Sequence, residues 1–438
     1  MIDDASAYGV NVREQGVKGD GVTDDAPAMQ RLLDARTPLL YFPPGVYLVG
    51  TTLRVPSNTR LEAHRFACFR LADQAGRDVD TFLLCNADLD HGNENISIRG
   101  GSWDGNCANN PRRDENDRNG FTGAMINFRH VRGLSLVDMT LKNSTAYHTR
   151  LSGVRDFRLE RIRFEDTIQT RNQDGVHVAG GCEDGLIRDI VAVGESCTGD
   201  DLVALNADDA LDRSETRGKL GGPIRRIRVE GLRADDCHSF VRMASVWSVI
   251  EDIEIHDVRG GCRINVINAD ALRFCASPLF RRDDARYAGG AGLLRRVRLR
   301  DVAVYKSAAS DTAFLRLDER MEDFEVEGFT RLTAADADPR APTIQVAFQN
   351  ADGIALEGVG QDDVAACKAG SDCVSLAVSS LPRAASAAAA FRVEAAVAPS
   401  GKFLSWCPRF DRFRVERSRL DPLPEPDWTV RKGQYAMQ

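Results

Sequence analysis

One pattern recurs along most of the chain: two apolar residues around a spacer, a two-residue break, and then a second apolar pair. Alternation over three residues is typical of a strand with one face turned inward. The break resets which face the next pair presents, so it predicts a bend or bulge. Each copy therefore predicts two short strands that meet at a corner. Copies begin at Ile96 (ISIRGGSW), Leu134 (LSLVDMTL), Phe157 (FRLERIRF), Ile227 (IRVEGLRA), Ile253, Val297, Phe324, Ile354 and Phe413.

The copies follow one another at irregular intervals. Such spacing is typical of coils with a fixed number of strands whose loops take insertions on one side. Stacked coils bury one another's apolar faces and form a parallel β-solenoid. A β-propeller would need antiparallel hairpins, and Asn-Gly hairpin signals are nearly absent from this chain. The sequence therefore predicts an all-β protein, a right-handed parallel β-helix.

A solenoid must cover its open ends. Near the N-terminus, GDGVTDDAPAMQRLLDA predicts a short amphipathic capping helix with Thr23 or Asp24 as N-cap. The Ala-rich stretch LPRAASAAAAFRVEAAVAPSGK is compatible with a helix or a linker. We expect an N-terminal cap with the first strands (1–50), a β-helix that carries the groove (51–380), and C-terminal coils with a tail that help to cap the solenoid (381–438).

Composition excludes several classes of partner. The net charge of −8 argues against nucleic acid, since phosphate binding relies on clustered Lys and Arg. No stretch approaches the roughly 20 apolar residues of a membrane span. The start MIDDASAYGV lacks the features of a secretory signal, so we expect a secreted or periplasmic protein if a leader was removed and a cytoplasmic one otherwise. The 11 cysteines show no CxxC spacing and predict buried free thiols, with a Cys367–Cys373 disulfide left open.

Two acidic segments stand out near the middle of the chain, NQDGVHV (172–178) and TGDDLVALN (198–206). Each acid alone is compatible with a turn. Asp174 and Asp200 are 26 residues apart, close to one coil, and neighbouring coils lie about 4.8 Å apart. Stacking is therefore compatible with the roughly 6.5–9.5 Å carboxyl separation of inverting glycosidases. Three acids this close cannot all ionise freely, so we expect one to keep its proton near neutral pH, as acid–base hydrolysis requires.

The chain resembles known families at two places. The opening VKGDGVTDDAPAMQRLLDA…LLYFPPGVYLV resembles the N-terminal cap of many pectin-degrading and tailspike β-helix proteins. The segments GGSWDGN, NSTAYHTRLSG, NQDGVHV and TGDDLVALN resemble, in this order, the polygalacturonases of glycoside hydrolase family 28. That family carries Asn-x-Asp-Gly, Gly-Asp-Asp, Gly-His-Gly and Arg-Ile-Lys motifs. The resemblance covers residues 10–270.

The resemblance implies that Asp174, Asp200 and Asp201 are the catalytic carboxylates. Asp200 would be the acid, and the other two would hold and deprotonate the water. His238, in CHSFVRMAS, matches the family histidine, although Cys237 and Ser239 replace its flanking glycines. We expect His238 to hydrogen-bond the acid or a sugar hydroxyl.

Substrate contacts are also implied by the resemblance. Arg263, in CRINV, matches the family arginine, but Asn265 stands where the family lysine grips a galacturonate carboxylate. A uronic-acid substrate is therefore in doubt. Asn265, at the position of that lysine, and Arg242 are further candidates for binding substrate oxygens. The remaining candidates are Tyr147 and His148, expected to stack on a sugar, Asn172 of the Asn-x-Asp-Gly motif, and His177, which either faces the groove or is an ordinary strand histidine.

We expect an inverting glycoside hydrolase that cleaves a poly- or oligosaccharide without a metal ion or other cofactor, as a monomer or a trimer. Two alternatives use the same fold. A polysaccharide lyase would release products that absorb ultraviolet light, and chelation of Ca²⁺ would abolish them. A tailspike-like or carbohydrate-binding β-helix would bind sugar without cleaving it. The sequence does not indicate the sugar, the linkage, or endo against exo action.

Overall fold

The chain forms two compact units, residues Met1–Val203 with Asp212–Leu220 and residues Ala204–Leu211 with Gly221–Gln438. The computed structural model describes residues 9–113, 119–208, 216–270, 292–310, 312–317, 321–332, 335–338 and 341 and, beyond these, the backbone of six strands. Both units are built from parallel strands, and the predicted right-handed parallel β-helix is confirmed as the fold class.

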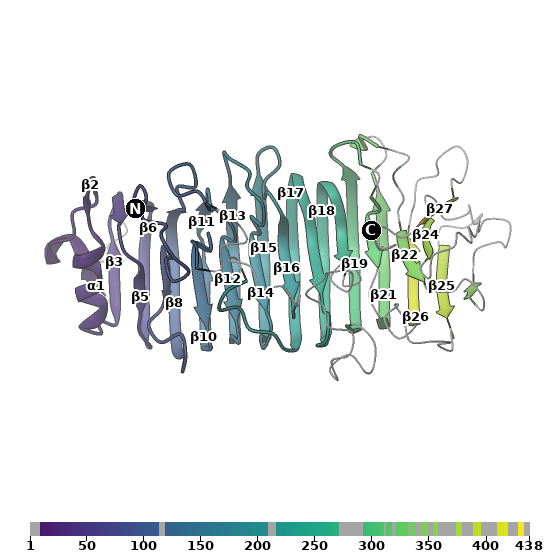
Figure 1. Ribbon diagram of the computed structural model, residues 1–438, viewed down its shortest axis with the longest axis horizontal. Coiled ribbons are helices and arrows are strands. Elements are labelled where there is room, and N and C mark those ends of the chain that lie inside the picture. Colours follow the sequence, from purple (N-terminus) through teal and green to yellow (C-terminus); the bar gives the residue numbers. More distant parts are fainter. Residues whose placement is uncertain are drawn as a thin grey trace. The chain divides into compact units, whose positions relative to one another are not determined.

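Three ladders of parallel strands build the first unit. One joins β3, β6, β8, β10, β13 and β15, a second joins β4, β6, β8, β11 and β13, and a third joins β5, β7, β9, β12 and β14. Figure 1 shows β8, β10, β13 and β15 side by side. The strands are β1 (Val10–Asn11), β2 (Asp20–Asp24), β3 (Leu39–Phe42), β4 (Gly45–Val49), β5 (Leu53–Val55), β6 (Thr59–Leu71), β7 (Leu84–Asn86), β8 (Asn93–Asp104), β9 (Ile126–Arg129), β10 (Val131–Val137), β11 (Thr140–Lys142), β12 (Thr149–Ser152), β13 (Arg155–Glu165), β14 (Val176–Ala179) and β15 (Glu183–Val193), and β16 (Asp201–Asn206) begins here.

The bend predicted inside each repeat is present, and it has one backbone cause. The second residue of the two-residue break adopts a left-handed conformation in each copy between residues 96 and 331. That conformation turns the chain between the two strand segments, so both apolar pairs point inward. Gly, Asp and Arg occupy the position, and the residues are Gly100, Asp138, Arg161, Gly231, Asp257, Asp301 and Gly328. Asp189 of β15 has the same conformation, and β15 pairs in register with β13.

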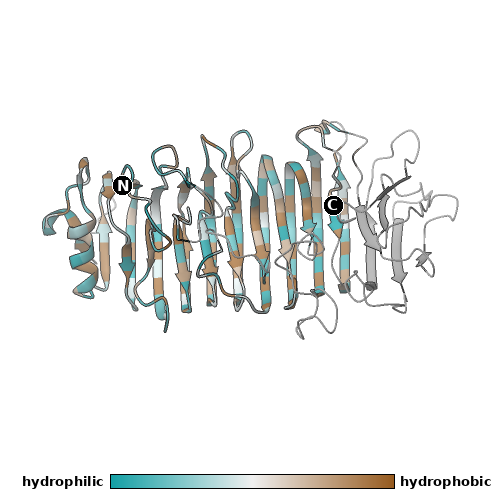
Figure 2. Ribbon diagram, viewed as in Figure 1, coloured by the Kyte–Doolittle hydropathy of each residue, from teal (hydrophilic) through white to brown (hydrophobic). Residues whose placement is uncertain are grey.

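Copies of the repeat stack in register. In the first unit, Ile96 pairs with Leu134, which pairs with Phe157, and all three side chains are almost fully buried. At the N-terminal end, Phe69 stacks on Trp103 with ring centroids 4.1 Å apart. Figure 2 shows the resulting alternation of apolar and polar residues along the strands. Burial of each large apolar side chain contributes roughly 1.5–3 kcal/mol, so stacking is the main stabilising term.

The N-terminal helix α1 (Ala26–Asp34) follows the short 3₁₀ helix η2 (Val12–Gln15) and packs on β4 and β5. The predicted N-cap, Thr23 or Asp24, is wrong, because Asp25 occupies that position. The Asp25 carboxylate is buried and accepts backbone N–H groups of Lys18 and Gly19 at 2.6 and 2.8 Å, so it fixes the preceding loop instead of the helix end.

In the second unit, β17, β18, β19, β21 and β26 form one parallel ladder. The C-terminal strands also pair antiparallel, as β22 with β24 and β25 with β26. Residues 389–395 of the Ala-rich stretch are strand β25, so the predicted helix or linker is wrong there. The strands are β17 (Ile224–Ala244), β18 (Ile250–Ala269), β19 (Leu294–Lys306), β20 (Leu315–Leu317), β21 (Met321–Arg331), β22 (Ile344–Phe348), β23 (Ile354–Glu357), β24 (Val374–Val378), β25 (Ala389–Ala395), β26 (Phe410–Ser418) and β27 (Trp428–Lys432).

The seven cysteines in the described residues are free thiols, and six of them are buried, as predicted. Burial raises the pKa of Cys182 to about 12, so this thiol stays protonated. Cys367 and Cys373 lie outside the described residues. Within the described part of the chain, no helix has the length and apolarity needed to cross a membrane.

Candidate functional site

The two acidic segments meet on consecutive coils of the first unit. Asp174 lies just before β14, and Asp201 is the first residue of β16. The Gly175 N–H donates to the Asp201 carbonyl at 2.9 Å, and the Asp200 N–H donates to the Gln173 carbonyl at 3.4 Å. The backbone therefore brings the three predicted carboxylates into one region.

The three acids differ in exposure. Asp174 and Asp201 are 4% and 1% exposed, whereas Asp200 is half-buried. A carboxylate oxygen of Asp200 lies within 4.8 Å of one of Asp201. Two carboxylate oxygens this close can both contact one water molecule or one divalent cation. The half-buried acid is the one of the three that a large substrate reaches most readily.

Glycines on both acidic segments allow the backbone of each segment to lie close to its neighbours. A Cβ atom at Gly175 would lie 2.6 Å from the Leu202 carbonyl oxygen and 2.8 Å from the ring of Phe164. A Cβ atom at Gly199 would lie 2.6 Å from Gln173 Oε1. The Asp-Gly and Gly-Asp-Asp sequences therefore have a steric reason for their glycines, because the chain passes too close to its neighbour for a side chain.

His177 contacts the Asp174 carboxylate directly. Its Nδ1 lies 2.5 Å from Asp174 Oδ2, and both side chains are at most 6% exposed. The Tyr147 ring stacks on the His177 ring with centroids 4.0 Å apart. His177 is thus part of the candidate site, and the sequence pattern left this open. Its spacing of three residues from Asp174 was the available signal.

The roles predicted for Tyr147 and His148 do not fit their positions. Tyr147 is 4% exposed and His148 is fully buried, because His148 packs edge-on against Phe164 and Tyr147 covers His177. Neither ring offers a free face to a sugar. Asn172 is half-buried at a left-handed position, and its side-chain oxygen accepts a hydrogen bond from Arg112 at 3.3 Å.

His238, Arg242, Arg263 and Asn265 belong to the second unit. His238 is half-buried, and its Nδ1 lies 3.2 Å from the Ser239 hydroxyl. Arg263 forms a two-pronged ion pair with Asp236, at 2.6 Å for its shortest contact. A substrate oxygen would compete with this carboxylate for the guanidinium.

Arg242 and Asn265 lie deeper in the second unit. Arg242 donates to the fully buried Asp270 at 2.8 Å. Asn265 is fully buried, and its amide donates to the Ala313 carbonyl. The substrate-binding role predicted for Asn265 therefore does not fit, because the amide is inside the coil and holds the neighbouring turn.

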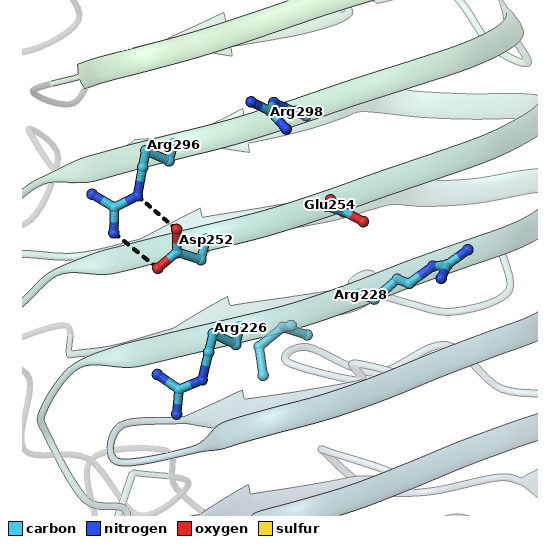
Figure 3. A pocket seen from close by; sticks show the side chains of 7 residues that line it. Arg226, Arg228, Asp252, Glu254, Arg296 and Arg298 are labelled. Atoms are coloured by element: carbon cyan, nitrogen blue, oxygen red, sulfur yellow. Dashed lines mark hydrogen bonds and ion pairs between the residues drawn. The ribbon is translucent and has the colours of Figure 1, made fainter.

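A pocket of about 340 Å³ in the second unit is lined by charged side chains of β17, β18 and β19 (Figure 3). Its arginines are engaged by acids: Arg296 donates to Asp252 at 2.6 and 2.8 Å, and Arg298 lies 3.4 Å from Glu325. We interpret these ion pairs between neighbouring strands as a feature that fixes the strand register, since opposite charges on facing strands favour one alignment. The lining residues are Arg226, Ile227, Arg228, Asp252, Glu254, Arg296 and Arg298.

Sequence reasoning missed three buried polar residues of the first unit. Gln173 donates to the Ser144 carbonyl at 2.7 Å and holds the turn before Asp174. Asp166 contacts the His148 ring at 2.9 Å and accepts the Asn143 N–H at 2.6 Å. Arg150 pairs in register with His177 and donates to Asn127 at 2.8 Å, and burial lowers the pKa of Arg150 to about 10. Gln173 had a signal, because it stands between two motif residues; Asp166 and Arg150 had none.

Comparison with protein families matches residues 9–62 to the family "Rhamnogalacturonase A/epimerase, pectate lyase-like". Among curated proteins, the preneck appendage protein of Bacillus phage PZA is 37% identical over 108 residues, 24% of this chain. The match spans only 12% of the length of that phage protein. The polygalacturonase of Gossypium barbadense is 24% identical over 241 residues, 52% of this chain and 58% of that protein.

Among solved structures, an exopolygalacturonase from Thermotoga maritima superposes with a TM-score of 0.50 at 15% identity. The superposition covers 74% of this chain and 86% of that one. At this identity the likeness concerns the fold alone. The chain therefore has the right-handed parallel β-helix fold, and its match to the pectate-lyase-like family covers residues 9–62.

Proposed function

We propose that this protein is an inverting glycoside hydrolase acting on a poly- or oligosaccharide. The observation that carries the proposal is the pairing of the Asp174–Gly175 segment with the Asp200–Asp201 segment on consecutive coils. Similarity to a polygalacturonase over about half of the chain supports it. Loss of the family lysine at Asn265 leaves a substrate other than galacturonan open.

The proposed chemistry uses one acid and one base. Asp200, the half-buried carboxyl, gives its proton to the glycosidic oxygen as the bond from that oxygen to the anomeric carbon breaks. Asp174 and Asp201 hold a water molecule on the opposite face of the sugar, and one of them takes its proton as the water oxygen bonds to the anomeric carbon. His177 orients the Asp174 carboxylate through the 2.5 Å contact. His238 and Arg263 remain candidates for contacts with the sugar.

The test is a panel of glycans assayed for new reducing ends, with the wild type against Asp200→Asn. We expect kcat to fall by about 10²–10⁴-fold, because proton donation to the leaving group is lost. Asp189→Asn is the matched control: Asp189 is exposed and sits at a left-handed bend that Asn also tolerates. Equal turnover in the two variants would remove Asp200 from the proposed role.

A second candidate is a carbohydrate-binding β-helix without hydrolysis, as in a virion appendage. The similarity to the phage preneck appendage protein favours it. Light scattering and glycan binding on the same sample separate the two. Binding without new reducing ends, from a particle with the mass of three chains, would favour the appendage; reducing ends that depend on Asp200 would favour the hydrolase.

A further inference from the structure

The backbone around Asp174 is held by an unusual number of donors from one neighbour. The Asp174 carbonyl accepts both the backbone N–H and the ring Nδ1 of His148, each at 2.9 Å. One residue further on, the Gly175 carbonyl accepts both the backbone N–H and the hydroxyl of Thr149, each at 3.1 Å. A regular parallel ladder supplies one donor per carbonyl. Here the side chains of His148 and Thr149 add a second donor to each of the two carbonyls at the candidate base.

The other nitrogen of His148 faces Asp166. His148 Nε2 lies 2.9 Å from Asp166 Oδ1, and both side chains are fully buried. Asp166 also accepts the Asn143 N–H at 2.6 Å and the Cys197 thiol at 3.6 Å. Cys197 lies three residues before Asp200. Asp166 therefore joins the segment that carries Asp174 to the segment that carries Asp200.

The hydrogen positions follow from the partners. A carbonyl oxygen only accepts, so Nδ1 of His148 carries a hydrogen. One further proton lies between Nε2 and the Asp166 carboxyl group. A buried carboxyl with this many donors is costly to disturb, because removing one partner leaves the others unsatisfied.

We propose that His148 and Asp166 are positioning residues, which fix the Asp174 backbone and the Cys197–Asp201 turn relative to each other. The proposal rests on the proposed role of Asp174 and Asp200 in hydrolysis. It replaces the sugar-stacking role predicted for His148, whose buried ring cannot reach a substrate. Small displacements of reacting groups lower kcat strongly, so such a device acts on turnover and not on binding.

Two substitutions at the same position separate the two hydrogen bonds. An asparagine amide reaches the position of Nδ1, and a glutamine amide reaches the position of Nε2. His148→Asn retains the bond to the Asp174 carbonyl, whereas His148→Gln retains only the bond to Asp166. We expect His148→Gln to lower kcat by about 10–100-fold with KM unchanged and His148→Asn to lose far less. Phe164→Leu is the packing control, because it removes the edge-on ring contact and leaves both hydrogen bonds.

Similar kcat losses in the Gln, Asn and Leu variants would overturn the proposal, since they would show a packing role only. A second measurement does not depend on substrate: nitrogen NMR of wild-type protein with labelled histidine, with the His148 signal identified by its absence from the variants. A hydrogen on Nδ1 is expected, and a bare Nδ1 would overturn the positioning role whatever the activity. A protonated Nδ1 in a protein that cleaves no glycan would count against the proposed function instead.

Discussion

Two sets of ionisable groups, one from each unit, lie in opposite surroundings. In the first unit, Asp174, Asp166 and His148 are buried, and each contacts a few defined partners. In the second unit, the arginines and acids of the outer face are exposed and face opposite charges on neighbouring strands (Figure 3). Both sets belong to coils of the same design, but they occupy different positions within the coil.

The difference shows which positions of the coil can hold ionisable groups buried and fixed in place. The outward positions of the first strand segment of each repeat face solvent, so charges there contribute little individually and serve register. Asp174 and Asp200 lie instead at the turns before β14 and β16, and both of these strands are buried on both faces. Groups there are held by fixed donors, as a reaction centre requires. Substitutions in the buried set should therefore lower the free energy of unfolding more than substitutions in the exposed set.

The largest effect is expected from Gly175→Ala. The new Cβ atom would meet the Leu202 carbonyl oxygen at 2.6 Å, so the coils must separate beneath Asp174. We expect a loss of up to about 3 kcal/mol in the free energy of unfolding and loss of activity. The matched change is Gly328→Asn, at a bend of the second unit where the nearest atom is 3.4 Å away and other copies carry Asp. Chemical denaturation measures the free energy of unfolding of both variants. Equal losses would contradict the view that the turn at Gly175 tolerates a side chain less well than the bend at Gly328.

Glu251 is the exception within the charged face, because it is 8% exposed and accepts hydrogen bonds from Arg225, Arg295 and Arg296. Burial alone would raise the pKa of Glu251, but the three arginines outweigh it and lower the pKa below its ordinary value of 4.5. The stability it contributes is fully present above pH 4.5 and is lost as the pH falls through the lower folded value.

We expect Glu251→Gln to lower the free energy of unfolding by about 1–2 kcal/mol at neutral pH, since the half-exposed arginines are partly screened. Thermal unfolding of both proteins between pH 7 and 3 checks this. The gap between the two melting temperatures should narrow below pH 4.5. A gap that stays constant with pH would show that the substitution acts through packing.

Periodicity was sufficient to predict the fold. Alternating apolar pairs such as Leu134 and Leu136 define an inward face, and the fixed two-residue break at Asp138 defines the corner. The residue type at the bend is a poor predictor of its left-handed conformation, because Arg161 adopts the same conformation as Gly100. Stacking of the coils overrides the preference of a single residue for a right-handed backbone.

The candidate site was only partly predictable. The spacing of the coils predicts that the acids meet, but it does not predict the buried side chains that contact them. The meeting of Asp174 with Asp200–Asp201 followed from motif order and spacing. Burial of His148 did not, since a histidine beside a tyrosine in a turn has the same pattern whether its ring points outward or inward. Its direction depends on Asp166, which is one acid among 65 acidic residues and has no distinguishing neighbours.

The smallest effect is expected for the exposed pair Arg298 and Glu325, which lie 3.4 Å apart with side chains 50% and 33% exposed. Solvent screens such a pair, and holding two long side chains in one geometry costs entropy. Glu325→Gln should change the free energy of unfolding by less than about 0.5 kcal/mol, and the change should disappear in high salt. Urea denaturation at two salt concentrations measures it. A salt-insensitive loss as large as that of Glu251→Gln would mean that exposed and buried charges in this fold do not differ, and the contrast between the two regions would then rest on the aspartates alone.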